Sequence, residues 1–460
     1  MNHSAASPHH AERANSTRIA LFWAGIRDSL WFVPALCTVT AVVLALVVVR
    51  FDRGWRPSGW VTGMLFSGGA EGARGVLSAV VGSLITVTGV IFSVTIVALQ
   101  LASSQFTPRV LRGFMADRAN QVVLGIFIGT FTYAVMVLRS VTSGEDGQPA
   151  FVPEAGVTVA IVLVLVSIGA LIYFIDHAAR SIQASVILAR EAEHTLHRVE
   201  RLFPRHIGSP EGDAPVLRAP SAPAGIVLAE RGGYLLAVHA DSLFHLAEAR
   251  RLTVQMEPPI GAFILVGEPL ASVWPKTALD DTVIDAVRDA FVLGDERTPE
   301  QDAELGIIVI ADMAVRALSP GINDPTTASL CIDRLAEILA RLGTVADPVP
   351  TRVSSSGDIR FLARPTTFAR AVGLAFDQIR HFGGSNPTIA KKLLDTLGRL
   401  GMLVTGEGRE VLAEQMEMTL AQAQLGQMIP GDLRRVEHLA ATKLAMLREA
   451  AEPSSGADDG

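Results

Sequence analysis

Apolar residues are grouped along this chain in two different ways. In the first 175 residues they form four long runs without a charged residue, at 29–49, 76–102, 120–138 and 156–175. Further on, they recur at helical or alternating spacing between polar positions. Each run reaches the roughly 20 residues that a helix needs to cross a hydrocarbon core. The pattern therefore predicts an α-helical membrane protein with four transmembrane helices, followed by a water-exposed region.

The second run carries a stripe of small and polar residues at spacings of three and four. Its members are Gly82, Thr86, Gly89, Ser93, Gln100 and Ser104, with Val97 completing the spacing. One interpretation is close packing between helices, because small residues let helix backbones approach each other and hydroxyls can bond across them. The alternative is a water-filled path that the stripe lines. Packing is the favoured interpretation, and the two coincide if several subunits assemble around an axis.

Basic residues mark one side of the predicted membrane. Arg109, Arg112 and Arg118 follow the second run, and further arginines precede the first run and follow the fourth. The positive-inside rule then places both termini in the cytoplasm. The three arginines are expected as topology anchors, or alternatively as an inner collar that attracts anions and anionic lipids. His177, beside Asp176 at the end of the fourth run, is expected in a solvated pair.

The water-exposed region shows several composition shifts. They predict a helical stalk at 177–203, a proline-rich linker at 204–223, a small β-rich module at 224–275 and a cytoplasmic α-helical domain at 276–451, with disordered tails at 1–28 and 452–460. The strands of the module are expected as hairpins, one of them around Arg231–Gly233. Helices are expected at 280–293 and 299–318, the second opened by a capping box of Thr298, Pro299 and Gln301. The later helices are expected as an antiparallel bundle.

Composition supports this division and narrows the classes of function. Hydrophobic residues make up 49% of the chain, charged residues 18%, and the mean hydropathy is +0.37, as expected for a membrane part joined to a soluble part. The net charge of -7 gives no basic footprint for nucleic acid. Cys37 and Cys331 offer no disulfide framework and no metal-ligand spacing. No phosphate loop, dinucleotide fingerprint or nucleophile elbow is present, so we expect neither an enzyme nor a bound cofactor.

One polar loop between two helical runs is a candidate ligand site. The stretch RALSPGINDPTTASL contains Ser319, Asn323, Asp324, Thr326 and Thr327. The Pro-Gly pair ends one helix and Asp324 caps the next, and a helix N-terminus with spare donors also favours an anion. We expect Asp324→Ala to destabilise the domain and Asn323→Ala to leave folding intact.

A second pair in this region is expected to be structural. Asp312 and Arg316 are four residues apart in an apolar helical run, so they can pair on one face. Partial burial of the carboxylate would make Arg316 its counter-ion.

Two stretches resemble a known family. VTIVALQLASSQFTPRVLRGFM in the membrane half and DERTPEQDAELGIIVIADMAVRALSPGINDPTTASLCIDRL in the soluble half are similar to the bacterial predicted-membrane-protein family catalogued as domain of unknown function 2254. The resemblance covers about residues 27–448 and implies an inner-membrane protein with a cytoplasmic region. It implies no activity.

These features favour an oligomeric channel or transporter-like protein with a cytoplasmic regulatory domain. Four spans are few for a solitary carrier, so a homo-oligomer in the lipid bilayer is expected. The alternative is a membrane-anchored sensor or scaffold, whose cytoplasmic domain binds a protein partner or a small anion.

Overall fold

The computed structural model describes the chain in two compact units. Described residues are 29–54, 65–105, 117–143, 150–181, 183–202, 220–299, 301–344, 351–353, 358–364, 366–404 and 406–450. The first unit is Arg18–Val186, and the C-terminal unit begins at Ile187. Both expected tails, most of the expected linker, Arg109 and Arg112 lie outside the described residues.

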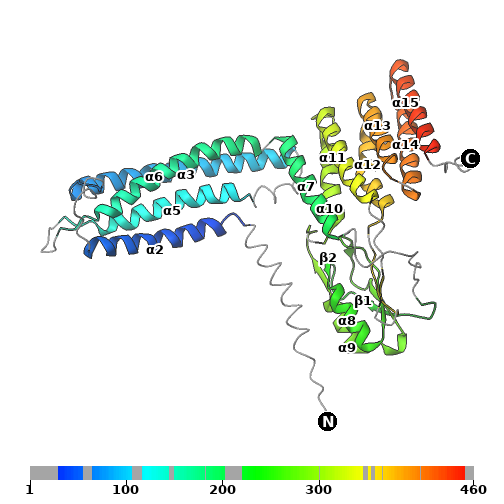
Figure 1. Cartoon of the computed structure of the whole chain (residues 1–460), viewed down its shortest axis with the longest axis horizontal. Helices are drawn as coiled ribbons and strands as arrows, with labels where there is room; N and C mark the ends of the chain where they lie inside the picture. The colour runs from blue at the N-terminus through cyan, green and yellow to red at the C-terminus, as the bar shows by residue number, and fades with distance from the viewer. Residues whose placement is uncertain are drawn as a thin grey trace, which may run out of the picture. The chain divides into compact units, whose positions relative to one another are not determined.

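The first unit contains four long apolar helices (Figure 1). They are α2 (Phe32–Gly54), α3 (Ala70–Gln105), α5 (Arg118–Ser140) and α6 (Glu154–Ser181). All four are long and apolar enough to cross a membrane, so this part of the prediction is confirmed. Each helix overlaps one predicted run and continues past at least one of its ends.

Helix α5 forms the centre of this unit, because it packs against α2, α3 and α6. Its glycines allow α2 to come close: a Cβ at Gly125 would lie 2.7 Å from the Cys37 Sγ, and one at Gly129 would lie 3.4 Å from the Cys37 carbonyl oxygen. Large side chains fill the remaining contacts, with Phe127 and Tyr133 fully buried.

Polar contacts fix the ends and the middle of the four helices. Asp52, near the end of α2, accepts hydrogen bonds from the amides of Ala155 (3.3 Å) and Gly156 (2.9 Å) in the first turn of α6. Halfway along, the Ser167 hydroxyl donates to the Thr130 hydroxyl at 3.1 Å, and both side chains are buried. Such contacts hold helices together where the hydrophobic effect gives no preference for one packing over another.

The expected stalk, residues 177–203, is helical in two pieces rather than one. Helix α6 ends at Ser181, and a separate helix α7 (Ala184–Leu202) follows. Four residues of α7 are buried at spacings of four, three and four: Leu188, Ala192, Thr195 and Val199. From Ile187 onward, α7 therefore belongs to the C-terminal unit rather than to a free stalk.

The β module contains two sheets and two helices. Its elements are β1 (Gly225–Leu228), β2 (Gly233–Val238), α8 (Ala240–Arg250), β3 (Thr253–Met256), β4 (Phe263–Ile264), β5 (Pro269–Trp274), the short 3₁₀ helix η3 (Lys276–Ala278), α9 (Asp281–Asp289), β6 (Phe291–Gly294), β7 (Thr351–Val353) and β8 (Ile359–Leu362). One sheet has the order β1-β5-β3-β8-β7 and the other β4-β2-β6. Only the β3–β8 pair is parallel among these described strands. Buried side chains from both sheets, such as Leu235 and Val273, share one core.

This arrangement corrects the expected hairpins and the expected end of the module. Strands β1 and β2 belong to different sheets, and so do β4 and β5. Three later strands also join the module. One of them, β6, includes residues 291–293, expected at the end of a helix, and lies beside β2. A short apolar run such as Phe291–Gly294 fits a helix end or a strand equally well, and only the neighbouring β2 decides between them.

The remaining helices form three stacked hairpins rather than a simple bundle. They are α10 (Ala303–Ala317), α11 (Pro325–Gly343), α12 (Phe368–Gly383), α13 (Pro387–Gly401), α14 (Glu407–Leu425) and α15 (Pro430–Glu449). Helices α10, α12 and α14 pack as one row, and α11, α13 and α15 pack as a second row (Figure 1). Successive hairpins with this packing make a short helical solenoid. We call these six helices the helical stack.

The three hairpin turns meet at one end of the stack. A Cβ at Gly383 would lie 2.8 Å from Leu318, one at Gly384 would lie 2.7 Å from Gln422, and one at Gly426 would lie 2.5 Å from Ser385. Glycine is therefore what lets neighbouring turns pack this closely. We call this surface, made of residues 318–323, 382–388 and 425–431, the turn end.

Candidate functional site

The polar stripe of α3 faces away from the rest of its unit. The buried residues of α3 are Ala73, Leu77, Val80, Leu84, Ile91 and Ala98. Gly82, Thr86, Gly89, Ser93 and Gln100 are all exposed. Stripe positions lie two residues from buried ones, about 200° around an α-helix. A Cβ at Gly82 or Gly89 would have nothing within 4 Å, so these glycines make no close helix contact within the described part of this chain. Packing between subunits stays a prediction.

The stripe has an internal repeat of seven residues. The Thr86 hydroxyl donates to the Gly82 carbonyl at 3.1 Å, and the Ser93 hydroxyl donates to the Gly89 carbonyl at 2.9 Å. Gly75, also exposed and open, extends the glycine spacing by one repeat. A period of seven matches the 3.5-residue repeat of two helices that cross in a left-handed sense. Ser104 lies in α3, but its side chain is outside the described residues.

The expected basic collar is described at only one of its three positions. Arg118 is the first residue of α5 and is exposed. Directly before it, Asp117 caps α5 by accepting the Ala119 amide at 2.9 Å. The other Asp117 oxygen lies 3.1 Å from the His177 Nε2, and Tyr173 stacks on the His177 ring.

His177 therefore pairs with a residue that the sequence analysis did not single out. Its chain neighbour Asp176 instead binds Arg180 at 2.8 Å on an exposed surface. Asp117 could have been found from the sequence as a helix N-cap, because it stands directly before an apolar helix and Asp is a favoured residue at that position. Asn120, one turn further along α5, is buried, and both polar atoms of its side chain lack a hydrogen-bond partner among the described residues.

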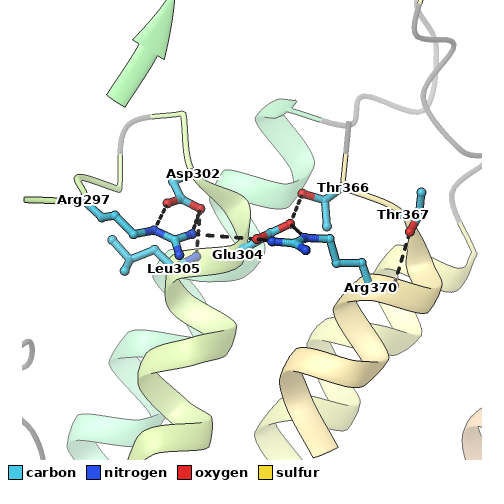
Figure 2. Close-up of polar contacts among 7 residues, drawn as sticks. All are labelled: Arg297, Asp302, Glu304, Leu305, Thr366, Thr367 and Arg370. Atoms are coloured by element: carbon cyan, nitrogen blue, oxygen red, sulfur yellow. Dashed lines mark hydrogen bonds and ion pairs between the residues drawn. The ribbon is translucent and has the colours of Figure 1, made fainter. Parts of the chain in front are cut away.

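In the C-terminal unit, two buried carboxylates meet two arginines at the start of α10 (Figure 2). The Asp302 and Glu304 side chains are each only 2% exposed. Arg297 holds Asp302 through two hydrogen bonds, of 2.7 and 2.9 Å. Arg370 holds Glu304 through two more, of 2.5 and 3.0 Å, and the Thr366 hydroxyl donates to Glu304 at 3.1 Å.

These four residues connect different parts of the C-terminal unit. Arg297 packs on the β module at Gly261, where φ is +82° and a Cβ would lie 2.4 Å from the guanidinium. Arg370 comes from α12 in the helical stack. Its hydrogen bonds to Glu304 raise the pKa of the Arg370 guanidinium, so the guanidinium stays charged. Buried carboxylates that are paired with arginine in this way more often stabilise the packing of two parts of a protein than act as catalytic acids or bases.

The start of α10 differs from the expected capping box. Asp302 is the N-cap, and its side chain accepts the Leu305 amide at 3.0 Å. Thr298 and Pro299 precede the helix, and Gln301 instead accepts the Val238 amide of the β module at 3.0 Å. The predicted capping box was wrong because the Gln301 side chain binds the distant Val238 amide rather than the backbone of its own helix.

The candidate loop of Ser319, Asn323, Asp324, Thr326 and Thr327 is a helix junction. Asp324 is the N-cap of α11, as expected, and accepts both the Thr327 amide (3.0 Å) and the Thr327 hydroxyl (2.6 Å). These two bonds hold the pKa of Asp324 below its ordinary value. Asn323 has a φ of +49°, in the left-handed region. The backbone of Asn323 thus lies where the chain turns between the two helices. The expectation about Asn323→Ala did not take this left-handed conformation into account, and its outcome stays a prediction.

The other residues of interest on these helices have structural environments. Asp312 and Arg316, on one face of α10, are both half-buried. Cys331 is fully buried in α11, and burial raises the pKa of its thiol to about 12. No group of three or more potential metal ligands occurs among the described residues.

Comparisons with known proteins fit this architecture. The model of the family DUF2254, described as predicted membrane proteins, matches residues 27–399. Uncharacterised proteins of Mycobacterium tuberculosis (Rv1290c) and Mycobacterium bovis (Mb1321c) are each 34% identical over 411 residues, which is 87% of this chain and 77% of the relative. No solved structure gives a significant match. The family match includes the four apolar helices, the β module and the first three helices of the stack, and it ends within α13. The chain therefore belongs to the DUF2254 family of predicted membrane proteins.

Proposed function

We propose that this chain is the subunit of a homo-oligomeric channel in the bacterial inner membrane, with both termini and the C-terminal unit in the cytoplasm. The observation that carries the proposal is the outward stripe of α3. Its polar and small residues lie opposite the buried face of the helix, so the described part of one subunit leaves them uncovered.

A lone subunit would expose this stripe to lipid. Gln100 lies within the candidate span Ala70–Leu101, and a carboxamide in hydrocarbon is costly unless it finds a hydrogen-bond partner. Assembly with α3 facing a common axis would remove the stripe from lipid. Gly82 and Gly89 would allow close approach, while Thr86, Ser93 and Gln100 would line the axis with oxygen and amide groups.

The arrangement of the C-terminal unit supports a regulatory role for it. The Arg297–Asp302 and Glu304–Arg370 pairs join the β module to the helical stack at the start of α10. Helix α7, which follows α6 in the chain, packs against α10 through Thr195 and Gly306. A ligand or partner that displaced one of these parts would strain the others.

The test compares two exposed glycines of the stripe with one exposed glycine on α6. Gly82→Leu with Gly89→Leu fills the stripe, whereas Gly169→Leu fills an equally open site on α6 that also has nothing within 4 Å. Full-length proteins are reconstituted in liposomes and in lipid nanodiscs, and ion flux and particle mass are measured. We expect the stripe variant to lose flux at least tenfold and to dissociate, and the Gly169 variant to match wild type. A monomeric wild-type protein without flux would refute the channel.

A second candidate function, a membrane-anchored scaffold, rests on the turn end of the helical stack. Its three segments contain no charged residue, yet Ile322, Phe382, Leu425 and Ile429 are 42–84% exposed. Exposed apolar surface of this kind is typical of protein-binding sites. Phe382→Asp with Leu425→Asp would remove the apolar surface without touching α3. Capture of one cytosolic protein from native membranes by wild type, but not by this variant, would favour the scaffold.

A further inference from the structure

Nine charged side chains on the last three helices of the stack form no ion pair within the described part of the chain. Two of them make hydrogen bonds instead: Arg409 donates to the Gly401 carbonyl, and Glu437 accepts from Gln424. A third, Glu449, lies at the end of α15.

The other six are sorted by sign between helices. The acidic ones are Glu407, Glu410 and Glu414, all on α14. The basic ones are Lys391 and Arg399 on α13 and Arg434 on α15.

Other charges on the same helices are paired within the chain. Lys392 binds Asp333 at 2.6 Å, and Lys443 binds Asp395 at 2.8 Å. The partners of both lysines lie on helices of the same row. Ion pairs within one row therefore account for part of the charge on these helices, and they include none of the six side chains.

The acidic side chains form one ridge. Glu407, Glu410 and Glu414 are three and four residues apart, so they lie along one face of α14, and all three are exposed. Buried residues of the same helix, Leu412 and Met416 among them, occupy the opposite face. This ridge belongs to the row of α10, α12 and α14.

The basic side chains lie on the other row, that of α11, α13 and α15. Lys391 and Arg399 fall on the side of α13 away from its buried Leu393, Leu397 and Leu400. Arg434 is exposed near the start of α15. Because α13 and α14 pack against each other through their buried faces, the acidic ridge and the Lys391–Arg399 side of α13 face away from each other. On α15, Glu437 and Glu449 lie on the same side as Arg434, so the positive charge is concentrated on α13.

We propose that these two surfaces bind each other between copies of this chain, the α14 ridge of one copy contacting the α13–α15 face of the next. Glu407, Glu410 and Glu414 would then meet Lys391, Arg399 and Arg434. Surfaces on opposite sides of a subunit make a heterologous contact, which closes into a ring when successive copies are related by rotation about one axis. Copies anchored in one membrane share an orientation, so the membrane normal is the natural axis.

The contact depends on membrane anchoring but not on the α3 stripe. Exposed ion pairs are individually weak, so separate soluble copies would associate little. Subunits held in one bilayer meet at a much higher effective concentration, which favours weak contacts. The helical stacks would then form a second, cytoplasmic interface beside any contact between the membrane helices.

The experiment maps this interface in the full-length protein in native membranes at low ionic strength. A photo-crosslinking amino acid replaces Ala421, which is exposed on α14 seven residues after Glu414. We expect a product of two chains in which the crosslinked peptide of the second chain comes from α13 or α15. A product that joins α14 to α14, or to a different protein, would overturn the proposal.

Charge exchange then tests whether the ion pairs drive the contact. E407K/E410K/E414K reverses the ridge, K391E/R399E/R434E reverses the basic face, and a third protein carries all six changes. We expect each triple variant to lower the yield of the two-chain product at least tenfold, and the six-fold variant to recover it. E248K/D289K/D295K, which makes the same net charge change as the ridge variant but on the β module, should leave the yield unaltered.

Two outcomes would contradict the electrostatic contact. One is an unchanged yield in both triple variants. The other is a six-fold variant that unfolds at the wild-type temperature yet remains as poorly crosslinked as the triples. Variants of Gly82 and Gly89 in the same assay separate this result from the fate of the channel, because the cytoplasmic contact should persist when the stripe is filled.

Discussion

Thr195 of α7 lies directly on Gly306 of α10, so closely that a Cβ at position 306 would fall 1.9 Å from the Thr195 Oγ1. The threonine is fully buried, and its hydroxyl donates to the Glu191 carbonyl at 2.7 Å. Arg198 contacts the same hydroxyl at 3.1 Å and binds Glu191 at 2.9 Å. This contact makes α7 part of the C-terminal unit.

The first prediction concerns this contact. Gly306→Ala will destabilise the C-terminal unit by about 1–3 kcal/mol, the usual cost of overpacking, despite the better helix propensity of alanine. Gly431→Ala on α15, where a Cβ would meet nothing within 4 Å, serves as the control. Chemical unfolding and amide exchange of residues 187–199 provide the measurement. Equal stability of the two variants would mean that α7 does not pack on α10 as described.

The Glu304–Arg370 pair gives a second prediction. Arg370→Met leaves a carboxylate that is only 2% exposed without its main partner, whereas Glu304→Leu combined with Arg370→Met removes both charges. We expect the single change to cost about 1–3 kcal/mol and the double change to cost less, because an unpaired buried charge is worse than an apolar pair. Arg370 is half-exposed, which keeps the cost near the lower end. A four-variant unfolding cycle measures the coupling, and strictly additive effects would contradict it.

Asn323 provides a third prediction through its backbone. At a φ of +49°, glycine and asparagine are tolerated and β-branched residues are strained. We expect Asn323→Gly to be neutral within about 0.5 kcal/mol, Asn323→Ala to cost about 1 kcal/mol and Asn323→Val to cost more. Thermal unfolding of the three variants gives the ranking. A loss in Asn323→Gly as large as in Asn323→Val would instead indicate that the amide side chain has a role of its own.

The fourth prediction is a pH dependence at Asp324. Hydrogen bonds from the Thr327 hydroxyl and amide lower the pKa of this carboxylate in the folded protein. The unfolded chain therefore takes up the proton first, so the stabilisation is complete above the ordinary pKa of 3.8 and is lost as pH falls through the lower folded value. Asp324→Asn should remove this part of the acid sensitivity. Unfolding free energies measured from pH 6 downward, for wild type and variant, would contradict the assignment if the two curves stayed parallel.

The membrane half was largely predictable from sequence. An uninterrupted apolar run that is long enough to cross a bilayer is typical of a membrane-spanning helix, and the four helices form where the runs predict them. Helix caps were predictable where the signal is local, as at Asp324 and Asn386, whose side chains accept amides of their own helices. The capping box at Thr298 failed because a distant strand takes the Gln301 side chain.

Contacts between distant residues could not be predicted in this way. Asp117 and His177 are 60 residues apart, and Arg370 reaches Glu304 from 66 residues away. Nothing in the spacing of either pair marks the partner. The same limitation applies to the β module, where β3 pairs with β8 across more than 100 residues.

By itself, the sequence determined the four apolar helices, the family and the local caps, because hydropathy over 20 residues and side-chain-to-amide bonds within one turn are properties of short segments. Only the tertiary structure decided which way the α3 stripe points, since a helix has a buried face only once its neighbours are in place. It also decided that α7 belongs to the C-terminal unit and that the later helices stack in two rows. Those outcomes depend on close approach at glycines such as Gly306 and Gly383, and the residues that come close to them are distant in sequence.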